Sequence, residues 1–286
     1  MTKEDSFDER DIEDHDPPMP RDPEEIEMHE LEHALRGLTL LGDDTYLGMQ
    51  AMNIAVVDKF IMPIETDARS WRARDEGIDM AGAMFLNAQS QMWLFSVYEL
   101  LRTWRERAKN VQKWAANGGL DMKISALEAD KGFHHLNRTA FAKVLRRIKT
   151  DAASLQAIKD DLARTHVLFG ELEFLRVALA RHEVSGRPKL MAYAPGYARI
   201  DMWTGSMSYE LSIGHIVLGE VTRRSIADGL RALTTDRTVP TPESLADFDA
   251  FMKLSPEAHP FDPPTENSPK DCIGLGEGSP TASSSS

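Results

Sequence analysis

Apolar side chains recur at steps of three and four residues through most of the chain, which is the spacing of one face of an α-helix. Proline and glycine are sparse between residues 78 and 185, where helix-forming residues dominate. The pattern predicts helices over residues 22–38, 44–62, 78–116, 123–129, 133–148, 151–181 and 209–233. We therefore expect an all-α protein built as an up-and-down helical bundle.

Proline and glycine mark where two of these helices should end. Pro63 is expected to stop the second helix, because proline lacks the backbone N–H that a helix interior needs. Gly118 and Gly119 supply a C-terminal stop for the third helix. Residues 185–205 are rich in Gly, Pro and Tyr and predict a loop.

Charged side chains interrupt the apolar stripes of the two longest helices. The first stripe consists of Phe85, Ala88, Met92, Phe95, Glu99 and Arg102, and the second of Leu155, Ile158, Leu162, Thr165, Phe169, Leu172, Arg176 and Leu179. The face next to the first stripe carries Leu94, Val97, Tyr98, Leu101 and Trp104. A charge in a core position costs free energy unless it pairs or lines a cavity. If these helices pack, Glu99 should therefore pair with Arg176 and orient its guanidinium group.

Composition divides the chain into three parts. Residues 1–33 hold fourteen acidic and three basic side chains, and residues 236–286 hold nine and three together with many Pro and Ser. Such segments bury too little apolar surface to offset the chain entropy lost on ordering. We expect a mostly disordered acidic tail at 1–33, a helical-bundle domain at 34–235 and a disordered acidic tail at 236–286.

The charge distribution narrows the classes of partner. The whole chain carries a formal net charge of −13, of which residues 1–33 contribute −11 and residues 236–286 contribute −6, so that the middle carries +4. The acidity of the whole chain argues against a nucleic-acid partner, whereas the mildly basic middle permits one.

Cysteine usage and hydropathy indicate the compartment. The single cysteine, Cys272, excludes a disulfide framework within one chain, which suits a reducing environment. The N-terminus has no apolar stretch of the signal-peptide type. No window is apolar over the length that a bilayer requires. We expect a cytoplasmic protein with no membrane partner.

The segment from His29 to His33 matches H-E-x-x-H, a pattern in which two histidines one helical turn apart hold zinc. Glu32 places a charge between the two histidines, where such enzymes carry an uncharged residue, and no third histidine follows at the required spacing. The segment also lies in the acidic tail, where a water-excluding site is hard to build. We interpret it as a solvated acidic helix, and we expect no metal and no cofactor.

The end of the helix over residues 151–181 carries the strongest candidate chemistry. Arg176 lies in its apolar stripe, and His182 follows six residues later, where the helix gives way to a loop. Six helical residues advance by about 600°, so only unwinding after Arg181 brings His182 back toward Arg176. The alternative is structural, because the helix dipole favours basic residues such as Arg181 and His182 at a C-terminal end.

This arrangement resembles the signature of the HEPN superfamily, in which an Arg is followed after four to six residues by a His at the end of a long helix. Residues 91–102 are similar to the other central helix of that family, where an acidic residue, here Glu99, often faces the motif. The resemblance covers residues 45–233. One position departs from the pattern, since Val177 stands where the family usually has a polar residue directly after the Arg.

The resemblance implies a homodimer of helical bundles and a metal-independent endoribonuclease of the kind found in toxin–antitoxin and other defence systems. His182 would move a proton while the RNA 2′-hydroxyl attacks its own phosphate. Arg176 would bind that phosphate, with Glu99 beside it, and Arg102 and Arg181 would contact the RNA substrate. An antitoxin-type protein is a further expected partner. The alternative, favoured by Val177, is a non-catalytic helical binding or dimerisation module with the same fold.

Overall fold

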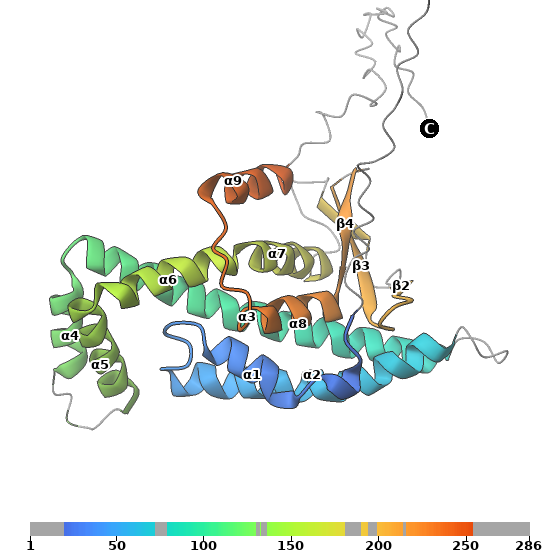
Figure 1. Ribbon diagram of the computed structural model, residues 1–286, viewed down its shortest axis with the longest axis horizontal. Helices are drawn as coiled ribbons and strands as arrows, with labels where there is room; N and C mark the ends of the chain where they lie inside the picture. Colours follow the sequence, from blue (N-terminus) through green and yellow to red (C-terminus); the bar gives the residue numbers. More distant parts are fainter. Residues whose placement is uncertain are drawn as a thin grey trace, which may run out of the picture.

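The computed structural model describes residues 20–71, 79–129, 132, 136–180, 190–193, 199–213 and 216–253. The elements in chain order are the 3-10 turn η2 (Pro23–Glu25), α1 (Met28–Arg36), α2 (Thr45–Trp71), α3 (Met80–Ala116), α4 (Leu120–Glu128), α5 (Leu136–Thr150), α6 (Ala152–Arg164), α7 (His166–Ala180), β1 (Leu190–Tyr193), β2 (Arg199–Ile200), β3 (Met207–Ile213), β4 (Ile216–Thr222), α8 (Arg223–Ala232) and α9 (Pro242–Phe251). Most described residues are helical, which confirms the predicted helical bundle. The long helices lie side by side, with the α4–α5 hairpin at one end and a small sheet at the other (Figure 1).

The folded region begins before residue 34. In α1, Leu31 and Leu35 are fully buried, and this helix packs against α2. The Glu30 carboxylate accepts the backbone N–H of Glu27 at 2.9 Å, which satisfies a donor that the first helical turn leaves free. The boundary expected after residue 33 therefore falls inside a helix, because two leucines at helical spacing suffice to anchor an otherwise acidic segment.

Helix α2 does not stop at Pro63 but continues to Trp71. Pro63 lies on an exposed side of the helix, so the Lys59 carbonyl that loses its helical partner can be hydrated instead. On the inner side, Ile61, Met62 and Ala68 are buried both before and after the proline. Packing of this inner side thus outweighs the cost of the proline.

Helix α3 matches its predicted bounds closely and is followed by Gly118, whose φ of 73° is the left-handed conformation expected after a helix. The inward face, however, is the adjoining one that carries Leu94, Val97, Tyr98, Leu101 and Trp104, all of them buried. The stripe that begins at Phe85 faces outward. The side chains of Phe85 and Met92 are both more than half exposed. The two apolar faces adjoin on one helix, and periodicity alone does not say which one packs.

The helix predicted over residues 151–181 is interrupted once, at Thr165, and so becomes α6 and α7. The fully buried Thr165 hydroxyl donates to the carbonyl of Asp161 at 2.7 Å and accepts from Arg105 at 2.8 Å. A side chain that bonds the backbone in this way competes with the helical ladder. The rest of the segment is helical as predicted, and α7 packs against α3.

In the segment predicted as a last helix over residues 209–233, residues 209–213 and 216–222 are strands instead. Strand β3 is central in an antiparallel sheet, with β4 along one edge and β1 and β2 one after the other along the opposite edge. Two of these strands also replace parts of the expected 185–205 loop. The β3 residues Met207, Tyr209 and Leu211 alternate along the strand and are all buried, so the same apolar residues satisfy a period of two. Only α8 remains helical, and its Thr222 side chain caps it by accepting the N–H of Ser225 at 2.8 Å.

The folded region also extends past residue 235, because α9 packs on α7 within the segment expected to be a disordered tail. None of the α9 residues is buried. In Figure 1 this helix lies outside α7, on the side away from α3.

Candidate functional site

A groove lies between α2 and α3. It has a volume of about 650 Å³ and a partly apolar lining. The lining consists of Gln50, Asn53, Ile54, Val57, Gln89, Met92, Trp93, Phe95, Ser96, Glu99, Leu100 and Thr103. Ile54, Trp93 and Leu100 are buried, whereas Val57 and Met92 are exposed, so the former three lie deepest in the groove.

Further large apolar side chains stand exposed on the same two helices. These are Tyr46, Met49, Met52 and Phe60 on α2, and Met80, Met84 and Phe85 on α3. Together with Val57, Met92 and the groove they form what we call the α2–α3 face. Scattered exposed apolar residues are ordinary, but a groove between two packed helices that also expose several large apolar side chains is typical of an interaction surface.

The charges at the edge of this face are paired with one another. Glu99 lines the groove and accepts two bonds from Arg102 at 2.9 Å, and Arg102 also contacts Glu106 at 2.9 Å. The two glutamates raise the pKa of Arg102. Exposed pairs of this kind contribute little to stability, and one arginine shared by two glutamates leaves a net charge of −1 at the edge of the face.

Arg176 lies elsewhere, on α7, where its guanidinium carbon is 5.6 Å from the centre of the Tyr98 ring. Glu99 pairs within its own helix, and the described residues show no ion pair between it and Arg176. Tyr98 is buried and stacks on Phe169 with 5.5 Å between ring centres. Burial and the nearby Glu173 carboxylate raise the pKa of Tyr98. Arg176 is therefore held by an aromatic ring where a carboxylate was expected. Arg181 and His182 lie outside the described residues.

The same row of rings continues to Arg105 on α3. Its guanidinium carbon is 4.6 Å from the centre of the Phe169 ring, and it donates to the Leu162 carbonyl at 3.0 Å and to Thr165 at 2.8 Å. The Arg105 side chain is almost entirely buried, which lowers its pKa. Arg176, Tyr98, Phe169 and Arg105 thus form one continuous stack between α3 and α7.

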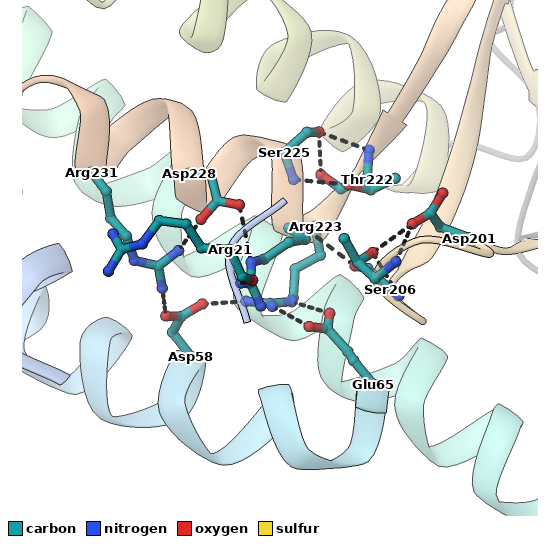
Figure 2. Close-up of polar contacts among 12 residues, drawn as sticks. Arg21, Asp58, Glu65, Asp201, Ser206, Thr222, Arg223, Ser225, Asp228 and Arg231 are labelled. Atoms are coloured by element: carbon teal, nitrogen blue, oxygen red, sulfur yellow. Dashed lines mark hydrogen bonds and ion pairs between the residues drawn. The ribbon is translucent and has the colours of Figure 1, made fainter. Parts of the chain in front are cut away.

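A buried charge network joins α2 to α8 (Figure 2). Arg223 donates to both carboxylate oxygens of Glu65 at 2.6 Å and to Asp58. Asp58 also accepts from Arg231, and in Figure 2 it lies between the two arginines. Arg223, Asp58 and Glu65 are all at most 2 % exposed.

The network is balanced and closed. Asp228 on α8 pairs with both Arg224 and Arg231, so three arginines face three carboxylates. Burial alone would lower the pKa of Arg223, but Glu65 and Asp58 outweigh it and raise the pKa. Arg224 also donates to the backbone carbonyl of Arg21 at 2.7 Å, which ties the start of the folded region to α8. Because its three positive charges are matched by three negative ones, we interpret this cluster as structural.

Metal ligands and membrane-spanning segments were also sought in the part of the chain that the structure describes. No group of three or more His, Cys, Asp or Glu side chains there is arranged to hold a metal ion. Glu30 of the H-E-x-x-H segment is bonded to Arg21 at 2.8 Å and to the Glu27 backbone. None of the described helices is both long and apolar enough to cross a membrane.

Comparisons of the chain with protein-family models, with curated proteins and with solved structures found no match. The geometry alone therefore carries the functional argument.

Sequence reasoning missed the α2 side of the groove and the whole buried network. A signal for the first was present: α2 is apolar on nearly all sides, which indicates that more than one of its faces has a partner. The network gave no comparable signal, because its partners lie more than 150 residues apart along the chain.

Proposed function

We propose that the protein is a helical dimerisation module in which two copies pack through their α2–α3 faces. The observation that carries the proposal is the apolar groove flanked by exposed methionine and aromatic side chains on two adjoining helices. Burying these side chains against a second copy would remove them from water, which is the main driving force of association.

The dimensions of the face suit self-association. Helices of 27 and 37 residues extend for about 40 and 55 Å at 1.5 Å per residue. A second pair of helices laid across them completes a four-helix arrangement. Met92 protrudes beside the groove, so the Met92 of one copy can enter the groove of the other.

The charges of the face favour a second copy over an oppositely charged partner. In a two-fold interface the same patch meets itself, so unpaired charges near the axis would repel. Glu99 is the sole charged residue among the groove lining, and it pairs with Arg102, which it shares with Glu106. The chain as a whole carries −13, so two copies approach more easily through a face with few charges than through an acidic surface.

The test is the molar mass in solution as a function of concentration, measured by light scattering and sedimentation. Met92→Glu should weaken the dimer at least about 30-fold, the effect of a central interface residue. Met122→Glu is the matched control, since Met122 is equally exposed but lies on α4, away from the face. A wild-type chain that stays monomeric at every concentration, or equal weakening by both variants, would refute the proposal.

An endoribonuclease is the second candidate, and one observation favours it. Among the described residues Arg176 makes a ring contact but no ion pair, which leaves its guanidinium group for a phosphate. RNA cleavage that persists in EDTA, leaves 2′,3′-cyclic phosphate ends and disappears in Arg176→Ala and His182→Ala would support it. An intact dimer that cleaves no RNA would leave the dimerisation module as the function.

A further inference from the structure

Helix α9 is held on α7 through the side chains of Phe248 and Asp249. The ring of Phe248 packs against Gly170, where an added Cβ would lie 2.7 and 3.0 Å from two of its ring carbons. The Asp249 carboxylate lies 2.7 Å from Nε2 of His166. Because no residue of α9 is buried, these contacts hold a helix that otherwise rests on the surface.

His166 bridges Asp249 to Arg105. Its Nδ1 lies 3.4 Å from a guanidinium nitrogen of Arg105, and a guanidinium group can only donate. Nδ1 therefore accepts, and Nε2 carries the hydrogen that is donated to Asp249. This hydrogen bond lowers the pKa of Asp249, as expected for a carboxylate bound in its charged form.

Arg105 lacks a carboxylate of its own. It is 6 % exposed, and none of the ion pairs in the described part of the chain includes it. Its Nε is buried without a hydrogen-bond partner. The carboxylates of Glu173 and Asp249 act on it only through the local field. A buried cation with an unused donor is costly unless an anion approaches it at some stage of the protein's function.

We propose that His166 and Arg105 form an oxyanion site that accepts a phosphate group, and that α9 is a hinged cover whose Asp249 occupies this site as an internal ligand. The Asp249 carboxylate already takes the position of the anion at Nε2 of His166, and Arg105 supplies a positive charge from the Nδ1 side of the same ring. The hinge is the stretch between α8 and α9, whose first part is fixed by the bonds from Arg164 to the Leu233 and Asp236 carbonyls.

The position of α9 relative to the aromatic stack adds to the argument. Arg105 is one end of the row that runs through Phe169 and Tyr98 to Arg176. Opening α9 would uncover the Arg105 end while leaving the α2–α3 face unchanged. The proposal is thus independent of dimerisation.

The experiment opens the cover in two unrelated ways in the full-length chain. Gly170→Ala raises the helix propensity of α7 while its methyl group displaces Phe248. Asp249→Asn removes the internal ligand. Asp247→Asn is the matched control, because it makes the same change of charge on the exposed side of the same helix. Hydrogen exchange of the α9 amides reports opening, and the ring nitrogen resonances of His166 report binding of inorganic phosphate at constant ionic strength.

We expect α9 amides to exchange at least about tenfold faster in Gly170→Ala and Asp249→Asn than in Asp247→Asn. Phosphate should shift the His166 signals saturably in both opened variants, with an apparent affinity at least about tenfold above wild type, because a tethered competitor acts at millimolar effective concentration. Adding Arg105→Gln to Gly170→Ala should abolish the phosphate response.

Two outcomes would overturn the inference. Equal α9 exchange in all three variants would show that the contacts do not hold a cover. Open α9 with a phosphate response no larger than that of Asp247→Asn would show that no oxyanion site lies beneath it. Neither outcome depends on the oligomeric state, so the dimerisation proposal is tested separately.

Discussion

The two sides of α2 reverse the usual relation between residue type and exposure. Its inner side buries the carboxylates Asp58 and Glu65 against arginines of α8. Its outer side leaves Met49, Val57 and Phe60 in contact with solvent. Trp93 of α3 separates the two regions, because its ring lies 5.2 Å below the Arg223 guanidinium and also lines the groove.

The comparison shows that burial follows from partners rather than from polarity alone. The inner charges are buried because each has a matched partner in a defined position, which fixes how α8 sits on α2. The outer apolar side chains are exposed because none of the described elements covers them. We interpret the buried charges on the inner side of α2 as residues that specify a unique fold. We interpret the exposed apolar side chains on its outer side as an interface without its partner.

The strongest test breaks the inner region. Asp58→Ala leaves Arg223 and Arg231 with fewer carboxylates in a closed environment, and we expect a loss of about 3–5 kcal/mol in the free energy of unfolding. Urea denaturation measures this loss. Asp121→Ala, which removes an exposed partner of Lys149, should cost less than about 1 kcal/mol. Similar losses in both variants would mean that the network does not hold the fold.

A second test probes the same side of α2 through its backbone. Gly205 has a φ of 75°, and a Cβ there would lie 1.8 Å from the Glu65 carbonyl oxygen. Gly205→Ala should therefore cost about 2–4 kcal/mol, from strain plus overpacking. Gly118 has a φ of 73° but no atom within 4 Å, so Gly118→Ala should cost only about 1 kcal/mol. Equal melting temperatures for the two variants would contradict the close approach.

A third test uses pH at the edge of the inner region. Hydrogen bonding to Arg21 lowers the pKa of Glu30 to about 2, from an ordinary value of 4.5. A lowered carboxylate pKa stabilises the fold above the unfolded value, and this stabilisation is lost as the pH falls from about 4.5 toward 2. The exposed Arg21 limits the effect to about 1 kcal/mol or less. Glu30→Gln should remove this component of the acid dependence, whereas an unchanged stability profile between pH 2 and 5 would argue against it.

The smallest expected effect concerns the outer region. Phe60→Ser and Met92→Ser change exposed side chains, so the unfolding free energy of the monomer should stay within about 0.5 kcal/mol of wild type. Measurement at a dilution that separates any dimer isolates this term. A loss of several kcal/mol would mean that these side chains belong to the core of the single chain.

Much of the helical frame was predictable, because α3 has uninterrupted helical spacing and glycines directly after it. The strands were not, since Met207, Tyr209 and Leu211 fit both a helical and a strand period until their partners are known. The degree of folding in the acidic segments around α1 and α9 was underestimated. An average over composition hides single packed side chains, such as Leu31 and Phe248, that hold a segment on the core. At the candidate site, the charges in the α3 stripe marked the rim of an open groove, and the pairing of Glu99 with Arg176 was not found among the described residues.

The distance along the chain between the members of the buried network has a consequence for biosynthesis. Glu65 and Asp58 are separated from Arg223 by 158 and 165 residues, and Asp58 is separated from Arg231 by 173. At roughly 5–20 residues per second, a ribosome completes α8 about 10–30 s after α2. During that interval the two carboxylates are hydrated rather than paired with arginine, so the inner side of α2 stays open to water. This part of the core can therefore close only after α8 has been synthesised.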